Sequence, residues 1–267
     1  MMCRTVVKGH FFCVFGKNMR IVTLMENTAL PGFAAEHGLS LYIETGNCRI
    51  LFDMGQSDAF ARNADALGID LAKVDFGVIS HGHYDHGGGL EAFFRRNSHA
   101  PVYASPYLLE GHYNRQGKDI GLNPALGSNP RLRFEDLKGT PGIALCTLNL
   151  PPEDNDGMFL LDGQPEDFRH EQYLRIREGD KTVLFSGCSH KGIVQIAQAF
   201  RPDVLVGGFH LMRTEDPAIL RQTARKLLNL PTRYATGHCT GTKQFEIMKA
   251  IMADRLDYWP AGTVKEL

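Results

Sequence analysis

The sequence predicts an α/β fold in which two β-sheets lie face to face and helices cover their outer sides. Strand-like and helix-like patterns alternate along the chain, histidines recur where the predicted strands end, and no linker or low-complexity tract separates the halves. The chain has 267 residues, of which 43% are hydrophobic, enough for one large core. We expect a single domain at residues 19–267, preceded by a poorly ordered extension at residues 1–18.

The first half of the chain begins with strands and short connections. Gly46-Asn47 lies between two apolar alternating segments and is typical of a hairpin turn. Ser57 or Asp58 is positioned to cap the first helix, and Gly68 to end it. The predicted strands are 21–24, 39–45, 49–52, 76–79 and 101–104, and the predicted helices are 57–67 and 89–96.

Residues 105–142 show little periodicity and contain several glycines and prolines. A long irregular insertion of this kind either caps a site or forms a surface loop. If it caps a site, its aromatic residues and Arg115, Arg131 and Arg133 are expected to shape the pocket.

The second half repeats the alternation of strands and helices. His190, His210 and His238 each lie in the turn that directly follows a predicted strand. Because sites in α/β folds are built at strand ends, these histidines are candidate site residues. The predicted strands are 171–177, 182–185, 203–206 and 233–235, and the helices are 193–199, 217–228 and 242–252.

The most informative segment is Ser-His-Gly-His-Tyr-Asp-His-Gly-Gly-Gly-Leu at residues 80–90, directly after a short apolar strand. His81 and His83 are two residues apart, so on an extended segment they point to the same side and can hold one ion. Asp85 and His86 follow a turn and can face a neighbouring ion. Imidazole and carboxylate groups suit zinc, and imidazole also suits iron, so the segment predicts a pair of divalent metals.

Composition excludes several classes of function. The formal net charge is −1 and Lys and Arg are not clustered, so no nucleic-acid partner is expected. No run of about 18 apolar residues exists, so no membrane span is expected. The six cysteines form no Cys-x-x-Cys pair or dense framework, which favours a reducing, cytoplasmic location.

The His81-x-His83-x-Asp85-His86 motif, followed by histidines at strand ends, resembles the metallo-β-lactamase superfamily. The resemblance covers about residues 20–260 and implies a four-layer αβ/βα sandwich with a binuclear metal site at one edge. Four further segments resemble a subgroup that includes dihydropterin-ribofuranosylaminobenzene phosphate synthases of methanopterin biosynthesis and proteins known only as metal-dependent hydrolases. These segments are 51–55, 187–193, 207–211 and 238–241.

The superfamily pattern implies a role for each matching residue. His81 and His83 would bind the first metal, and Asp85, His86 and His238 the second. For the third ligand of the first metal we favour His190, which lies on a strand-end turn, over His170. The metals are expected to be two divalent ions, zinc first, with Mn²⁺ and Fe²⁺ also compatible.

Cys188 stands where many superfamily members have an aspartate that bridges the metals. Its thiolate is either a metal ligand or a small buried group beside an unbridged site. Asp53 is expected to orient a metal-binding histidine, Cys239 to pack, and His210 to contact the substrate. Three other histidines receive no firm role. His37 is a borderline case, and His99 and His112 are expected to be loop residues.

These features favour a metal-dependent hydrolase in which a metal-activated hydroxide attacks an ester, lactone or phosphoester bond of a small molecule. Asp85 would orient the nucleophile and accept a proton, and His210 or a water molecule would protonate the leaving group. One alternative is a synthase of pterin metabolism that acts on a phosphorylated substrate. The other is a non-catalytic metal-binding protein, although structural zinc sites are normally closed.

Overall fold

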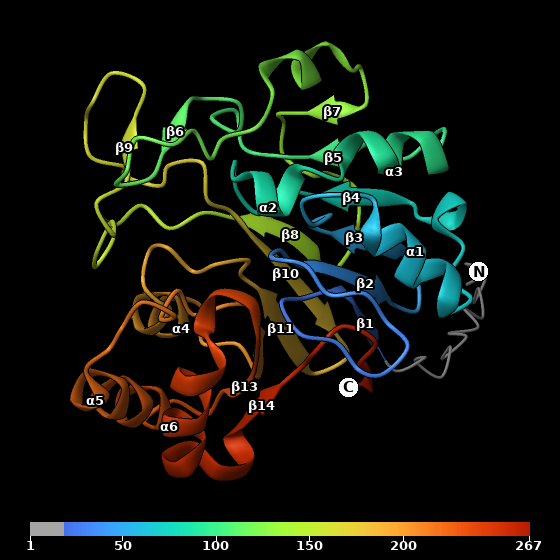
Figure 1. The fold of residues 1–267 in the computed structure, drawn as a ribbon. Coiled ribbons are helices and arrows are strands. Elements are labelled where there is room, and N and C mark those ends of the chain that lie inside the picture. Colours follow the sequence, from blue (N-terminus) through green and yellow to red (C-terminus); the bar gives the residue numbers. More distant parts are fainter. Residues whose placement is uncertain (1–18) are drawn as a thin grey trace, which may run out of the picture.

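The two β-sheets pack face to face, and helices cover the outer face of each (Figure 1). This computed structural model describes residues 19–267, and the extension expected at residues 1–18 lies outside the described residues. Within the described chain, the layers follow the order helix, sheet, sheet, helix. The predicted four-layer αβ/βα sandwich is therefore confirmed.

The first sheet has the strand order β15-β1-β2-β3-β4-β5-β7. Strands β3, β4, β5 and β7 run parallel, so the ends of β3 and β4 lie at the same edge of the sheet. That edge carries Asp53 and the histidine-rich segment. The strands are β1 (Arg20–Met25), β2 (Ser40–Glu44), β3 (Arg49–Phe52), β4 (Phe76–Val78), β5 (Val102–Tyr103), β7 (Leu132–Arg133) and β15 (Val264–Glu266).

The second sheet has the order β14-β13-β12-β11-β10-β8. Strands β11 to β14 are parallel, so the turns after β11, β12 and β13 meet at one edge and bring together the histidines that follow each strand. A separate antiparallel pair, β6 (His112–Tyr113) with β9 (Phe159–Leu160), belongs to neither large sheet. The strands of the second sheet are β8 (Ile143–Cys146), β10 (Tyr173–Glu178), β11 (Lys181–Phe185), β12 (Val204–Val206), β13 (Arg233–Thr236) and β14 (Leu256–Tyr258).

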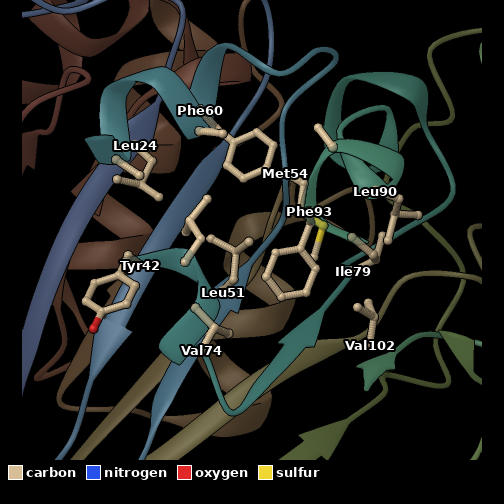
Figure 2. Close-up of a cluster of buried hydrophobic side chains, with 14 of the residues drawn as sticks. Leu24, Tyr42, Leu51, Met54, Phe60, Val74, Ile79, Leu90, Phe93 and Val102 are labelled. Carbon is tan, nitrogen blue, oxygen red and sulfur yellow. The ribbon is translucent and has the colours of Figure 1, made fainter. Parts of the chain in front are cut away.

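The helices bury their apolar faces on the outer sides of the sheets. Figure 2 shows the cluster beneath α1 and α3, where Phe60 and Phe93 meet Leu24 and Leu51 of the first sheet. Helices α4, α5 and α6 cover the second sheet in the same way. The helices are α1 (Ala59–Ala66), α2 (Tyr84–Gly87), α3 (Leu90–Arg96), α4 (Ile193–Phe200), α5 (Pro217–Leu228) and α6 (Thr242–Met252), and the short 3-10 turns are η1 (Leu71–Lys73), η2 (Pro124–Ser128), η3 (His238–Thr240) and η4 (Ala253–Arg255).

The core between the two sheets is formed by alternate residues of facing strands. Phe52 of β3 and Phe185 of β11 meet across it with ring centroids 5.8 Å apart, and both are fully buried. Burying a large apolar side chain contributes about 1.5–3 kcal/mol, so this layer holds the two halves of the chain together.

Most predicted elements are present with shifted ends, and β3, α5 and α6 have the expected bounds. Strands β8, β14 and β15 were not predicted, and the insertion at 105–142 contains β6, η2 and β7. No helix of the described residues has the length and apolar character that crossing a membrane requires.

Candidate metal centre

The histidine-rich segment is held in place by Asp53, which follows β3. The Ser80 backbone N–H and hydroxyl donate to the two oxygens of this carboxylate, each at 2.7 Å. Nδ1 of His86 lies 2.7 Å from the same carboxylate. Because β3 and β4 are parallel neighbours, Asp53 fixes the start of the segment and one of its rings at once. This is the orienting contact expected for Asp53.

Three buried imidazoles form a first group. Nε2 of His81 lies 3.1 Å from Nδ1 of His83 and 3.3 Å from Nε2 of His190. His190 is positioned from the second sheet, where its backbone N–H donates to Glu171 at 2.6 Å. Burial lowers the pKa of His83 to about 3 and depresses the pKa values of His81 and His190. All three rings are therefore neutral, the form that coordinates a metal.

Asp85, His86 and His238 form a second group. Nε2 of His238 lies 3.2 Å from Oδ2 of Asp85 and 3.1 Å from Nε2 of His86. Nδ1 of His238 is 2.9 Å from Oδ1 of Asn27, and Nδ1 of His86 faces Asp53, so both rings can direct the Nε2 lone pair inward. Burial opposes a charge on His86, yet attraction to Asp53 and Asp85 raises its pKa to about 9. The carboxylates of Asp53 and Asp85 thus make the second group a favourable place for a positive charge.

These residues fit a pair of divalent ions. Three imidazoles in one group and two imidazoles with a carboxylate in the other match the donor types and numbers of zinc sites that keep an open position. In each group the ring nitrogens of different residues face one another at 3.1–3.3 Å. Such facing nitrogens are satisfied when a shared ion accepts their lone pairs.

Cys188 lies between the two groups, since its sulfur is close to both His81 and His86 and is 3.2 Å from Nε2 of His86. Burial raises the pKa of the Cys188 thiol. Its sulfur also neighbours Cys239 and His210. A side chain on Gly208 would collide with the Cys239 sulfur, so the glycine makes room for this second thiol. Both cysteines thus line the site.

Four residues of the two groups, His83, Asp85, His190 and His238, line a cavity of about 720 Å³. His210 lies in its wall, with its ring centroid 4.2 Å from that of His190, and its Nδ1 has no hydrogen-bond partner among the described residues. Burial opposes a charge on His210, but contact with Cys239 raises its pKa. The rim is mostly acidic. Its charged residues are Lys118, Glu153, Asp154, Asp156, Arg213, Glu215 and Asp216.

Two histidines have surroundings that the sequence interpretation missed. His112 was expected to be a loop residue and His170 was the less favoured alternative to His190, but both are fully buried beside His83. The His170 ring centroid lies 5.7 Å from that of His81, compared with 4.8 Å for His190. Nδ1 of His170 accepts the Gly82 backbone N–H at 2.7 Å. His99 is exposed, as expected of a loop residue.

The insertion's three arginines do not line the described cavity, so the expectation that they shape the pocket is wrong. Arg131 donates to the Phe94 carbonyl at 2.9 Å and lies over the Phe94 ring, so it braces α3. Neither Arg115 nor Arg133 is among the residues that line the described cavity. The insertion contributes its wall through three other residues, Asn114, Lys118 and Ile120.

His37, Asn27 and Glu26 also belong to the site. Nε2 of His37 is 3.1 Å from Oδ2 of Asp85, and its ring is partly exposed at the cavity. Asn27 contacts His238, and Glu26 accepts the His238 backbone N–H. Glu26 and Asn27 directly follow strand β1. Their position at a strand end, which identified the histidines as site residues, could therefore have identified these two residues as well.

The chain is similar to several known proteins. The family model of the metallo-beta-lactamase superfamily matches residues 35–238. A 7,8-dihydropterin-6-methyl-4-(beta-D-ribofuranosyl)-aminobenzene-5'-phosphate synthase of Methanocaldococcus jannaschii is 29% identical over 265 residues, covering 85% of this chain and 89% of that protein.

Solved structures resemble the fold. A metal-dependent hydrolase of the beta-lactamase superfamily has a TM-score of 0.78 and 29% identity, covering 93% of this chain and 99% of its own. Zn²⁺-bound PqqB of Methylobacterium extorquens has a TM-score of 0.59 and 14% identity, covering 93% and 100%, a likeness of fold alone. With the family model matching most of its length, this chain belongs to the metallo-β-lactamase superfamily.

Proposed function

We propose that the protein is a binuclear metal-dependent hydrolase that cleaves an ester, lactone or phosphoester bond of a small molecule. The observation that supports this proposal is the pair of adjacent donor groups, four of whose six residues line an open cavity. His81, His83 and His190 would hold one ion, and Asp85, His86 and His238 the other. A closed structural zinc site would not leave its ligands facing a cavity of this size.

When bound, two such ions would polarise the scissile bond and lower the pKa of water. Asp85 would orient the nucleophile, since its carboxylate is fixed between His238 and His37. His210 would donate a proton to the leaving group. Its raised pKa and its unpartnered Nδ1 at the cavity wall suit an acid. Cys188, beside both groups, would be a ligand in place of the usual bridging aspartate.

The charge of the cavity suggests how a substrate would lie. Arg213 pairs with Asp156, and the acidic residues of the rim outnumber its two cations, Lys118 and Arg213, so the rim disfavours an anion. A phosphoryl or carbonyl group would therefore lie at the two metal-binding groups, where positive ions are expected. The neutral or hydrogen-bond-donating part of the molecule would face the acidic rim.

A synthase of pterin metabolism is the second candidate. It is favoured by the 29% identity to the dihydropterin-related synthase of M. jannaschii, which extends over 89% of that protein. A dihydropterin methyl diphosphate and a ribofuranosylaminobenzene phosphate would then be joined with release of pyrophosphate. An acidic rim is compatible with the donor-rich edge of a pterin.

Metal analysis comes before any substrate test. Purified wild-type protein, His81→Ala, His190→Ala and the exposed-histidine control His99→Ala would be compared by elemental analysis. We expect close to two ions per chain in wild type and His99→Ala, and fewer in both other variants. No metal in wild type after reloading would contradict the proposal, and an unchanged His190→Ala would remove His190 from the ligand set.

A substrate screen then separates the two candidates. Loaded wild-type protein would be given phosphodiesters, phosphomonoesters, esters and lactones, and separately the dihydropterin methyl diphosphate with the ribofuranosylaminobenzene phosphate. Water-dependent cleavage that is lost in Asp85→Ala supports the hydrolase. Pyrophosphate release that requires both pterin-pathway substrates supports the synthase.

We also propose that residues 19–267 act as one domain in the cytoplasm. Within the described residues Cys48, Cys146, Cys188 and Cys239 are free thiols, which supports a reducing compartment. Fluorescent-tag localisation and limited proteolysis of the full chain would test these two statements.

A further inference from the structure

Asn27, directly after β1, lies between two histidines at the cavity. Its Oδ1 is 2.9 Å from Nδ1 of His238, and its Nδ2 is 3.3 Å from Nδ1 of His37. The two rings are neighbours, with centroids 4.9 Å apart. The two different ends of one amide group therefore contact the same ring nitrogen of two adjacent histidines.

Two backbone groups fix the orientation of this amide. The Gly38 N–H donates to one end at 3.2 Å, so that end must be the oxygen, because only the oxygen accepts. The other end lies 3.4 Å from the His238 carbonyl, which accepts a hydrogen bond, so that end must be the nitrogen. A flipped Asn27 side chain would lose both hydrogen bonds at once.

The fixed amide gives the two rings opposite tautomers. The amide oxygen only accepts, so Nδ1 of His238 carries the proton and its Nε2 lone pair faces the second group. The amide nitrogen only donates, so Nδ1 of His37 carries the lone pair and Nε2 the proton. Nε2 of His37 is 3.1 Å from Oδ2 of Asp85 and therefore donates to that carboxylate.

We propose that Asn27 and His37 are positioning residues of the second group: Asn27 sets both tautomers, and His37 holds Asp85 through its Nε2–H. The ring nitrogens of His37 and His238 are equally close to Asp85, at 3.1 and 3.2 Å, but only His238 has a lone pair there for an ion. Both roles rest on the proposed metal function of Asp85 and His238, because the hydrogen-bond partners of a metal ligand orient it.

The backbone holds His37 beside the metal-binding motif. The Leu39 N–H, two residues after His37, donates to the Asp85 carbonyl at 3.2 Å. A side chain at residue 38 would come within 2.6 Å of the same carbonyl oxygen, so Gly38 allows this close approach. The His37 ring, although partly exposed, is thus fixed next to Asp85 by its own segment of chain. A change at Asn27 is therefore expected to move the proton of this ring more than the ring itself.

Asn27→Asp separates the functions of the two ends of the amide. The carboxylate still accepts from Nδ1 of His238 but presents a second acceptor to Nδ1 of His37. We expect Nδ1 of His37 to gain a proton while zinc affinity is kept, because a carboxylate also orients a metal-binding imidazole. Asn123→Asp is the matched control, since Asn123 is exposed and uses its side-chain oxygen to cap η2.

Truncation tests each positioning role through metal affinity. Asn27→Ala frees Nδ1 of His238, so we expect the zinc affinity of one of the two sites to fall about 10–100-fold in chelator competition. His37→Ala removes the donor to Asp85 and should also lower this affinity. His37→Gln, whose amide N–H₂ can still donate to Asp85, should lower it less.

Tautomers are read from ¹⁵N-histidine NMR spectra of metal-free and zinc-loaded protein, above the pH at which His37 titrates. Signals are assigned from the spectra of His37→Gln and His238→Gln. A proton on Nδ1 of His238 and none on Nδ1 of His37 in wild type, with a proton gained by His37 in Asn27→Asp but not in Asn123→Asp, would support the proposal. A proton on Nδ1 of His37 in wild type, or none gained in Asn27→Asp, would overturn the role of Asn27.

The positioning roles and the proposed function fail in different ways. Unchanged zinc affinity in a folded Asn27→Ala or His37→Ala would overturn the positioning role of that residue and leave the metal site in place. If wild-type protein binds no zinc, the hydrolase proposal and both positioning roles fail. The tautomers of the metal-free protein then still decide whether Asn27 sets the protons of the two rings.

Discussion

The buried contact between Asp53 and His86 links proton binding to metal binding. The pKa of His86 is about 9, because attraction to Asp53 and Asp85 outweighs the burial that opposes its charge. At pH 7, about 99% of metal-free molecules therefore carry a proton on both ring nitrogens. Nε2 faces the second group, so a metal that binds there must displace this proton. The pKa of His86 lies two units above pH 7, so removing its proton to bind a metal at this pH costs about 3 kcal/mol.

Asp53→Asn removes one of the two carboxylates that hold this proton. If the pKa of His86 falls toward 6.5, about a quarter of the rings are protonated at pH 7, and proton release from His86 drops from about 1 to roughly 0.2 per metal bound. Zinc affinity should nonetheless fall about 10–100-fold, because the amide no longer fixes the ring. In wild type the affinity should rise with pH until about 9.

Calorimetric titration with zinc in two buffers of different ionisation enthalpy measures the proton release directly. Asp65→Asn is the matched control, since Asp65 is an exposed carboxylate that pairs with Arg96. Equal proton release in wild type and Asp53→Asn would refute the reasoning. The stability of the metal-free fold has the opposite dependence on pH. The His86–Asp53 contribution is complete below about pH 6.5 and is lost as pH rises through 9.

Other changes have separable outcomes. His81→Ala should abolish metal loading and catalysis together, and an active metal-free variant would contradict its role. Loading with Cd²⁺ should give an ultraviolet sulfur-to-metal band that disappears in Cys188→Ser and persists in Cys48→Ser; a band that survives in Cys188→Ser would exclude that ligand. Phe52→Ala should lower the free energy of unfolding by about 3–5 kcal/mol in urea titrations, because Phe52 is fully buried between the sheets. A loss below 1 kcal/mol would mean that the intersheet core repacks.

The elements that sequence predicts well carry their own local signals. Helix α5 begins at Pro217 after Asp216, whose side chain accepts the Ala218 N–H, and both features are readable from the sequence. Strand β8 has no such signal. It follows a long irregular insertion, and its position depends on pairing with β10, more than twenty residues later.

The same distinction applies to the site. His81, His83, Asp85 and His86 share one short motif, so a single segment predicted their proximity. The surroundings of His112 depend on Glu166, which is 54 residues away, and on a wall that the two separate strands β6 and β9 create. Only tertiary packing identifies this pair, since neither residue belongs to a recognisable motif.

Each donor group draws on both halves of the chain. The turn after β4 supplies most of the donors, but His190 and His238 come from the opposite sheet. A bound ion would therefore act as a cross-link between the halves, resisting their separation in the way a disulfide does. Ligand present at 100 times its dissociation constant adds about 2.7 kcal/mol to the stability of a fold. A cell short of metal would then lose this protein to proteolysis as well as losing its activity.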